Sequence, residues 1–348
     1  MKSMPVAPRS EQCVARLIDA NLDRAREGLR VVEDWCRFGL DRADLVQPLK
    51  DWRQQLGQRH REHYKQARST AEDTAAGMAH PAQQKRPQPK QIVEANCARV
   101  QEALRVLEEF GRDQDAELAR TAATIRYGLY DLEVTILQAG KRAERRQRLD
   151  QCHLCLITAP AEGMLERVRA ALSAGVSLVQ YRAKQGHDRD RLAEAQAIAG
   201  LCRDHGALFI VNDRIDLALL VDADGVHLGQ DDLPTAAARS LIGDGRLLGR
   251  STHNLEQLQQ AQQEDCDYLG VGPIYATDTK PDSTAQGLHW AVQASEQASL
   301  PWFAIGGIHA DRIPELRQAG VRRVAVVGAI MAADDPQASS QVLLAALA

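Results

Sequence analysis

The sequence has few aromatic residues, no long apolar run and no large block of basic residues. Phe, Trp and Tyr make up 4% of the 348 residues, and the formal net charge is −4. Proteins that bind nucleic acid use aromatic stacking or a basic surface, so no nucleic-acid partner is expected. No segment approaches the roughly 18 consecutive apolar residues that a membrane span requires. Residues 1–11 lack the apolar core of a signal peptide, so we expect a cytoplasmic protein.

The cysteines are also sparse, and they are scattered through the chain. This distribution argues against a disulfide framework. Cys152 and Cys155 form a C-x-x-C pattern, in or beside the apolar run His153–Ile157. A strand places residues i and i+3 on opposite faces, which favours two core cysteines over a metal or redox pair.

The chain has two halves with different periodicity. From about Val14 to Gln138, apolar residues recur every three or four positions, which predicts helices throughout. Ser69–Lys90, rich in Ala, Pro, Gln and Thr, is expected to be a long loop, and the charged segment Lys141–Arg148 a solvated helix face or linker. From His153 onward, short apolar strands alternate with amphipathic helices. We therefore expect a helical domain over residues 1–150 and an α/β domain over 151–348.

Eight βα units are predicted in the second domain, which is typical of a compact (β/α)8 TIM barrel. A doubly wound open sheet is the alternative, but the first strand is not followed by a G-x-G-x-x-G turn. Helices are expected at Arg189–Asp204, Leu255–Gln263 and Ala310–Gln318, among others. The expected strands are His153–Ile157, Ser177–Tyr181, Leu208–Val211, Gly225–Leu228, Leu247–Gly249, Tyr268–Val271, Trp302–Ile305 and Val324–Val327.

Polar residues follow the second strand, where a barrel carries its active site. Gln180, Arg182 and Lys184 are two positions apart, so in an extended strand they share one face and point into the barrel mouth. Polar groups on an inner face are costly unless they hold a ligand. A guanidinium together with an ammonium suits a diphosphate.

Carboxylates follow the third and fourth strands. Asn212 and Asp213 end the third strand, and Asp232 lies in the loop after the fourth. Two carboxylates at neighbouring strand ends can share one Mg²⁺, which typically takes one or two carboxylates plus phosphate oxygens. The alternative is that Asp213 and Asp232 only cap the helices that follow them.

A second anion site is predicted near the last strands. Gly306-Gly307 and Val327-Gly328 end the seventh and eighth strands, where glycine lets backbone N–H groups approach a phosphate. Ser251, Thr252 and His253 follow the fifth strand. In the long loop after the sixth strand, the hydroxyls of Thr277 and Thr279 and the ammonium of Lys280 suit a phosphate or a phosphorylated intermediate, with a polar turn as the alternative. This layout suits the joining of two phosphorylated substrates, one of which loses diphosphate.

Residues 151–348 resemble the thiamine-phosphate synthase (thiamine-phosphate pyrophosphorylase) family. The order and spacing of several segments carry the resemblance. They are Val179-Gln180-Tyr181-Arg182-Ala183-Lys184, Val211-Asn212-Asp213-Arg214, Gly225-Val226-His227-Leu228-Gly229-Gln230-Asp231-Asp232, Gly270-Val271-Gly272-Pro273-Ile274-Tyr275 with Thr277-Asp278-Thr279-Lys280, and Ala304-Ile305-Gly306-Gly307-Ile308.

The resemblance implies a Mg²⁺-dependent transferase of thiamine biosynthesis. It would condense 4-amino-2-methyl-5-(diphosphooxymethyl)pyrimidine with a carboxylated or decarboxylated thiazole phosphate, giving thiamine phosphate and diphosphate. By resemblance, Asp213 and Asp232 are the Mg²⁺ ligands, and Arg182, Lys184 and Lys280 have catalytic roles. Contacts to the pyrimidine diphosphate are implied for Gln180, Arg182, Lys184, Asn212, Ser251 and Lys280, and the thiazole phosphate site for Thr277, Thr279, Gly307, Val327 and Gly328.

The chemistry agrees with that resemblance. Breaking the C–O bond to diphosphate leaves a pyrimidine methylene cation, and cationic side chains with Mg²⁺ stabilise the departing charge. The thiazole nitrogen, held in line, then attacks the cation. No protein nucleophile is required. At Gly328 many members of the family carry a side chain such as Ser, which puts the affinity for the thiazole phosphate in doubt.

The helical half contains an internal repeat, in which residues 20–33 align without gaps on residues 95–108. The repeated polar positions form one drifting helical stripe, with Asn21, Arg24, Glu27, Arg30 and Glu33 matching Asn96, Arg99, Glu102, Arg105 and Glu108. The half resembles an extension found on some thiamine-phosphate synthases, for which a pyrimidine-phosphate kinase activity has been suggested. No Gly-rich phosphate loop is present. A helical packing or dimer module is therefore favoured, with the stripes either paired in a buried interface or solvated.

Two other function classes share this kind of barrel. One is a different phosphate-binding barrel, such as a thiazole tautomerase or sugar-phosphate isomerase, and the other is a non-catalytic regulator. Neither needs all of Arg182, Lys184, Asp213, Asp232 and Lys280, and the sequence contains all of them. The synthase hypothesis is therefore favoured, with small-molecule substrates as partners and a homo-oligomer as an open alternative to a monomer.

Overall fold

The computed structural model describes residues 9–69, 86–277 and 284–348. The chain divides into two compact units, Met1–Gly140 and Lys141–Ala348. The barrel unit thus begins ten residues before the expected boundary at 150/151, because residues 141–150 make their contacts with the barrel.

The described residues of the first unit form helices joined by short connections, with no strand among them, as the periodicity predicts. None of the described helices is long and apolar enough to cross a membrane. Of the expected loop Ser69–Lys90, residues 70–85 lie outside the described residues, and Pro89 already starts a helix, where its missing N–H is not needed. The helices are α1 (Arg9–Asp34), the π-helix η1 (Trp35–Gly39), α2 (Ala43–Arg59), α3 (Glu62–Gln66), α4 (Pro89–Gln114) and α5 (Ala116–Asp150), whose last residues, 141–150, belong to the second unit.

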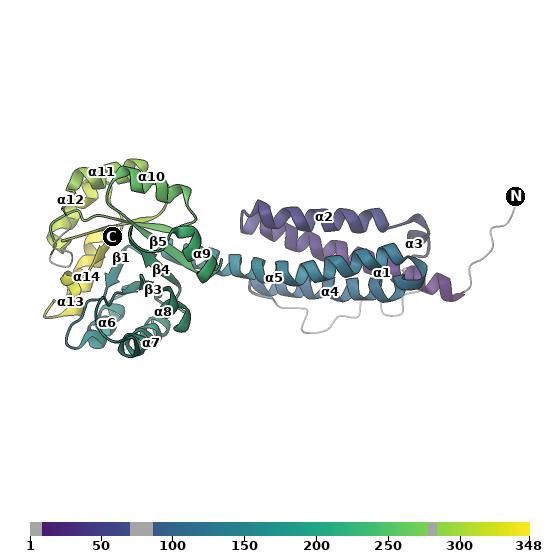
Figure 1. The fold of residues 1–348 in the computed structure, drawn as a ribbon, viewed down its shortest axis with the longest axis horizontal. Coiled ribbons are helices and arrows are strands. Elements are labelled where there is room, and N and C mark those ends of the chain that lie inside the picture. Colours follow the sequence, from purple (N-terminus) through teal and green to yellow (C-terminus); the bar gives the residue numbers. More distant parts are fainter. Residues whose placement is uncertain (1–8, 70–85, 278–283) are drawn as a thin grey trace. The chain divides into compact units, whose positions relative to one another are not determined.

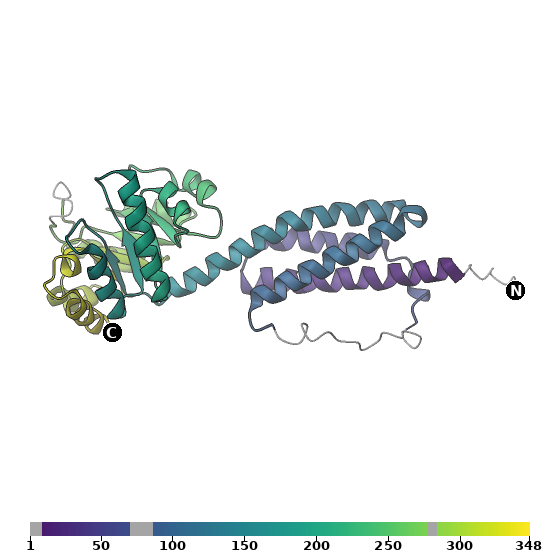
Figure 2. The same ribbon diagram turned by 90° about the horizontal axis from the view of Figure 1, so that it is seen from below.

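The two repeat helices, α1 and α4, pack closely against each other and run in opposite directions (Figures 1 and 2). They approach each other closely at Gly28, where an added Cβ would lie 2.6 Å from Cγ2 of Val100. Leu22, Leu29 and Leu104 are fully buried in the core of this unit. The absence of a side chain at Gly28 therefore allows the close packing of the repeats.

The repeated glutamates at the end of each stripe anchor the following helix. Glu33 accepts a hydrogen bond from Arg53 Nε on α2 at 2.9 Å. Its repeat equivalent, Glu108, accepts one from Arg126 Nη2 on α5, also at 2.9 Å. The repeat unit is therefore a pair of helices joined by an ion pair.

The alternative in which the two stripes pair across a buried interface is wrong. Arg24, Glu27, Arg99 and Glu102 are all exposed. The next arginine of each stripe pairs within its own helix, as in the 3.1 Å contact between Arg105 and Glu108. The helical crossing buries the apolar faces and turns these charges outward.

The second unit is a closed parallel barrel, so the TIM barrel prediction is confirmed and the open sheet is excluded. Helices surround the strands (Figure 1). The helices are α6 (Met164–Ser173), α7 (Asp188–Asp204), α8 (Ile215–Leu220), α9 (Thr235–Ile242), α10 (Leu255–Gln263), α11 (Leu288–Gln297), the 3-10 helix η3 (Ala310–Arg312), α12 (Ile313–Gln318), α13 (Gly328–Met331) and α14 (Pro336–Leu347). All eight expected strands are present, as β1 (Leu154–Ile157), β2 (Leu178–Tyr181), β3 (Leu208–Asn212), β4 (Gly225–Leu228), β5 (Leu247–Thr252), β6 (Tyr268–Val271), β7 (Trp302–Ile305) and β8 (Val324–Val326).

Side chains alternate between the barrel interior and the layer under the helices. Leu178, Leu208 and Ile210 belong to the inner cluster, whereas Val179 and Phe209 pack in the outer layer. The same alternation, continued along the strands, brings polar residues to the inner face near the strand ends. The lower barrel is therefore a packed apolar core, and the polar site lies above it.

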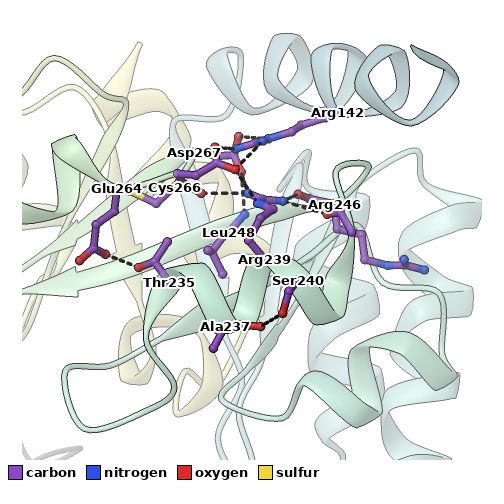
Figure 3. A network of polar contacts seen from close by, with 12 residues as sticks. Arg142, Thr235, Ala237, Arg239, Ser240, Arg246, Leu248, Glu264, Cys266 and Asp267 are labelled. Atoms are coloured by element: carbon purple, nitrogen blue, oxygen red, sulfur yellow. Dashed lines mark hydrogen bonds and ion pairs between the residues drawn. The ribbon is translucent and has the colours of Figure 1, made fainter. Parts of the chain in front are cut away.

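The segment Lys141–Arg148 is not a solvated face, so that interpretation is wrong. It is the end of α5, and Arg142 is only 6% exposed. Arg142 Nε donates to Asp267 Oδ1 at 2.8 Å, and Arg239 Nη2 donates to Asp267 Oδ2 at 3.0 Å (Figure 3). The backbone N–H of Leu248 also donates to Asp267, at 2.8 Å. The charge pattern concealed this role, because Asp267 lies more than a hundred residues from Arg142 along the chain.

Cys152 and Cys155 are core cysteines, as expected. Both are buried and free, and both belong to the inner apolar cluster of the barrel. Burial raises the pKa of the Cys152 thiol. Cys152 lies before β1 rather than within it, so the opposite-face argument does not apply to it.

Candidate active site

A cavity of about 490 Å³ opens at the carboxyl ends of the barrel strands. Its walls combine apolar side chains, glycine backbone and a few polar groups, which is typical of a small-molecule site. Residues predicted for both anion sites line it together. These are Arg182, Ser251, Thr277, Gly307, Val327 and Gly328.

The loop after β7 needs its glycines. Gly306 and Gly307 have φ values of 104° and 59°, which lie in the region that side chains avoid. A Cβ at Gly307 would also lie 2.9 Å from Cβ of Tyr275 in the loop after β6. The two glycines therefore allow the loops after β6 and β7 to approach each other at the cavity wall, where a side chain would not fit.

Polar residues of β2 and β3 meet on the inner face, as the alternation predicts. Gln180 Nε2 donates to Asn212 Oδ1 at 3.0 Å. The backbone N–H of Arg182 donates to Thr158 Oγ1 at 2.9 Å, which fixes the point where the chain leaves β2. The Arg182 side chain lines the cavity. These contacts position two amides and a guanidinium at one side of the barrel mouth.

Asp213 is held in an unusual backbone conformation directly after β3. Its φ is 61°, which is uncommon for a residue with a side chain and often marks a functional site. Its N–H donates to the carbonyl of His227 on β4 at 2.9 Å. Its carboxylate pairs with the Lys184 ammonium, which is half exposed. Two residues predicted to act on a diphosphate and a metal are thus in contact.

The helix-cap alternative is wrong for both aspartates. The helix after Asp213 starts at Ile215 with Arg214 at its N-cap and without a side-chain cap. The helix after Asp232 starts at Thr235, again without one. Asp232 Oδ2 instead accepts the N–H of Gly229 at 2.6 Å, which closes its own loop.

Asp213 and Asp232 could hold Mg²⁺ only together with oxygen ligands from the substrate. Asp213 and Asp232 follow β3 and β4, which are paired neighbours, and carboxylate oxygens are the ligands that Mg²⁺ prefers. Within the described ranges, no group of three or more His, Cys, Asp and Glu side chains could hold a metal. Mg²⁺ commonly keeps few protein ligands and binds substrate phosphates, so this pair is compatible with it.

Sequence reasoning assigned no role to His227, which lies on the inner face of β4. Its Nε2 lies 2.9 Å from Ser251 Oγ, and its Nδ1 lies 3.2 Å from the Tyr268 hydroxyl. Burial raises the pKa of Tyr268 well above its usual value, so this hydroxyl stays protonated and can donate to Nδ1. With Tyr268 as the donor to Nδ1, His227 would carry its proton on Nε2 and donate to Ser251, which would leave the Ser251 proton available to a ligand. Extending the alternation from Gly225 to His227 would have identified this residue.

Two predicted residues cannot be located in the structure, and two histidines that were not predicted line the cavity. Thr279 and Lys280 lie outside the described residues, so their roles stay predictions. His253 and His309 also line the cavity and were not singled out as site residues. The Nδ1 atom of His253 lies within hydrogen-bond distance of the Gly272 carbonyl, which orients its ring.

Two family models match the chain. The model described as thiamine monophosphate synthase matches residues 154–330. The ThiD2 family model matches residues 16–135. The first match falls in the barrel unit and the second in the helical unit.

The relatives extend over both units. The thiamine-phosphate synthase of Prochlorococcus marinus (strain MIT 9313) is 64% identical over 352 residues, covering 100% of both chains. The thiamine-phosphate synthase of Thermosynechococcus vestitus is 50% identical over 340 residues and covers 97% of each chain. A solved thiamine phosphate pyrophosphorylase from Pyrococcus furiosus is 34% identical with a TM-score of 0.52, and the match covers 58% of this chain and 96% of that one.

Proposed function

Because the chain belongs to the thiamine-phosphate synthase family, we propose that the barrel cavity joins its two phosphorylated substrates. The enzyme is a transferase that condenses 4-amino-2-methyl-5-(diphosphooxymethyl)pyrimidine with a thiazole phosphate, releasing diphosphate. One observation carries the residue assignment. Arg182, which follows β2, lines the same cavity as the glycine backbone after β7 and β8, and the amides of Gln180 and Asn212 are hydrogen-bonded to each other at the ends of β2 and β3.

The β2–β4 side would bind the pyrimidine diphosphate. Arg182 offers a planar donor set that matches diphosphate oxygens, and Lys184 adds a mobile positive charge. Gln180 and Asn212 can bind the pyrimidine ring through the amide groups that they leave free. Ser251, held by His227, can donate its hydroxyl proton to the same substrate. Lys280 is assigned to the leaving diphosphate by resemblance.

Mg²⁺ would be held by Asp213 and Asp232 together with diphosphate oxygens. Bound there, it would supply positive charge against the diphosphate as the C–O bond breaks. Lys184 pairs with Asp213 and so already lies where this charge develops. Its ammonium can turn from the carboxylate to the leaving group.

The β7–β8 side would bind the thiazole phosphate. Thr277 lies in the loop after β6, and Gly307 and Gly328 contribute backbone to the same cavity. Thr279 is assigned to this site by resemblance, and the Val327-Gly328 backbone can donate to phosphate oxygens. The apolar wall formed by Ile157 and Ile305 excludes water from the methylene cation.

In this arrangement the two substrates meet over the barrel core. The pyrimidine methylene loses its C–O bond, and the bonding electrons leave with diphosphate. The thiazole nitrogen donates its lone pair to the methylene carbon and forms the new C–N bond. Because the cavity holds both substrates in line, C–N bond formation no longer depends on a chance encounter in solution. This positioning would account for much of the rate enhancement over the uncatalysed reaction.

The experiment is product analysis with the full chain, both substrates and varied Mg²⁺. Wild type should form thiamine phosphate and diphosphate in a Mg²⁺-dependent reaction. Asp213→Asn should lower turnover at limiting Mg²⁺ by orders of magnitude, since lost metal charge costs several kcal/mol. Asp216→Asn is the matched control, because the only ion pair that Asp216 forms within the described ranges is with Arg214 on the surface. Equal rates for the Asp213 variant and wild type would reject the metal role.

A further inference from the structure

The two glycine carbonyls in the loop after β7 are both held by hydrogen bonds. The Gly306 carbonyl accepts the backbone N–H of Tyr275, in the loop after β6, at 3.1 Å. The Gly307 carbonyl accepts a hydrogen bond from Nη1 of Arg312, at the end of η3. These two contacts fix the planes of the peptides that join Gly306 to Gly307 and Gly307 to Ile308.

The N–H groups of the same two peptides have no acceptor in the described part of the chain. They belong to Gly307 and Ile308, and both residues line the barrel cavity. Ile308 is only 4% exposed, and buried N–H groups are nearly always hydrogen-bonded. A planar trans peptide directs its N–H opposite to its carbonyl, so the hydrogen bonds to the carbonyls also set where these N–H groups point. Both N–H groups therefore call for an acceptor from a ligand or water.

Arg312 is held in place by contacts outside the cavity. Its guanidinium carbon lies 4.3 Å from the centre of the Tyr275 ring, in a cation–π contact. The Tyr275 hydroxyl donates in turn to Glu315 on α12. Burial and this carboxylate raise the pKa of Tyr275, so its hydroxyl stays protonated. Arg312 is not one of the described residues that line the cavity, so its contact with the site runs through the Gly307 carbonyl.

We propose that Arg312 is a positioning residue for the thiazole phosphate, which it serves by directing the N–H groups of Gly307 and Ile308 at the phosphate oxygens. Successive backbone N–H groups make a concave site that suits an anion. The hydrogen bond to the guanidinium also draws electron density from the Gly307 carbonyl, which makes the Ile308 N–H a better donor. This inference rests on the thiazole phosphate site proposed above and names a residue that shapes it.

Arg312→Met tests the role, since methionine keeps a long side chain against the Tyr275 ring but has no donor for the Gly307 carbonyl. The full chain is titrated with the decarboxylated thiazole phosphate, without Mg²⁺ or the pyrimidine substrate. Binding should weaken by about tenfold, as expected when hydrogen bonds to a charged group are misaligned. In turnover assays the KM for the thiazole phosphate should rise by a similar factor, while kcat and the KM for the pyrimidine diphosphate stay close to wild type. Unchanged binding would overturn the proposal.

Arg312→Gln separates positioning from charge. Glutamine is neutral, but its amide group can still donate to the Gly307 carbonyl, so the affinity should recover to within about threefold of wild type. A loss as large as that in Arg312→Met would show that the positive charge matters and would reject the positioning role. Arg317→Met is the matched control, because Arg317 also donates to a backbone carbonyl, that of Ala346, at 3.2 Å on the surface. It should keep wild-type affinity, and an equal loss there would also reject the role.

Gly328→Ser distinguishes failure of this inference from failure of the site itself. Gly328 lines the same cavity, and a Cβ added to it would meet no atom within 4 Å. If the phosphate binds between β7 and β8, a serine hydroxyl there should change the affinity for the thiazole phosphate. A change in this variant but none in Arg312→Met would reject the positioning role alone. No change in either variant would reject the proposed thiazole phosphate site as well.

Discussion

Among single residues, Gly328 and Gly307 line the same cavity but differ in what they tolerate. Gly307 has a positive φ and faces a neighbouring loop, so a side chain there is strained. Gly328 is not among the glycines with positive φ, and a Cβ added to it would meet no atom within 4 Å. The open space at Gly328 would admit a small side chain such as that of serine.

Gly328→Ser should therefore improve binding of the thiazole phosphate. The added hydroxyl can donate to a phosphate oxygen, and a hydrogen bond of this kind contributes about 0.5–1.5 kcal/mol. The KM for the thiazole phosphate should fall by roughly two- to tenfold with little change in kcat, as expected for uniform binding. Gly307→Ser serves as the control and should lose activity. A higher KM in the Gly328 variant would contradict the prediction.

Much of the geometry of the candidate site could be predicted from the sequence, because closure of the barrel brings together the side chains that alternate onto the inner face of each strand. Gln180 and Asn212 are in contact, and Lys184 is paired with Asp213, although the sequence separates each pair by about thirty residues. The same alternation places His227 on the inner face of β4, but a histidine in an apolar strand gives no local sign of its partners. Its contacts to Ser251 and Tyr268 exist only once the strands close.

At the scale of the element, the end of α5 is fixed by a buried carboxylate. Asp267 is fully buried and binds Arg142, Arg146, Arg239 and the N–H of Leu248. A buried charge needs such partners, because its desolvation is otherwise uncompensated. We therefore expect the more deeply buried arginines to contribute more to the stability of the barrel.

Arg142→Ala should destabilise the barrel by roughly 3–5 kcal/mol, since it strands part of a buried charge network. Arg146 contacts the same carboxylate, but its side chain is 49% exposed. Arg146→Ala should cost about 1 kcal/mol or less. The urea midpoint for loss of synthase activity reports barrel unfolding in the full chain. Similar midpoints for the two variants would show that Arg142 is not the main anchor.

The repeat stripe should likewise separate into anchoring positions and exposed positions. Glu33 is buried and bonded to Arg53, so Glu33→Gln should destabilise the packing of α1 on α2 by about 1–3 kcal/mol. Glu102 is exposed, and Glu102→Gln should cost about 1 kcal/mol or less. Hydrogen exchange of α1 and α2 amides measures this local stability. Equal protection in both variants would contradict the division.

At the scale of the whole molecule, the sequence predicts both architectures but misplaces the boundary between them. The buried strands stand out as short apolar runs, because a parallel barrel covers both faces of each strand. Lys141–Arg148 looks like solvated charge, since nothing local reveals Asp224, Asp265 and Asp267 as its partners. Sequence periodicity cannot reveal ion pairs between residues that are far apart in the chain.

The location of the boundary determines which fragment is autonomous. A fragment of residues 141–348 keeps Arg142, Arg145 and the fully buried Leu149, together with the complete barrel core. It should fold alone and form thiamine phosphate, because a closed barrel carries its own core. A fragment of residues 151–348 contains every strand but loses all of these contacts.

The shorter fragment should unfold at lower urea or collect in the insoluble fraction. Removing Arg142 leaves Asp267 with one buried arginine, and removing Leu149 opens a cavity in the inner cluster, which costs roughly 2–5 kcal/mol for a leucine. Together these losses approach the whole stability of a typical domain, about 5–15 kcal/mol. Solubility, urea midpoint and product formation should be compared for the two fragments in parallel. If 151–348 equals 141–348 in all three, residues 141–150 are a linker after all, and the ion pairs of α5 contribute nothing to the barrel.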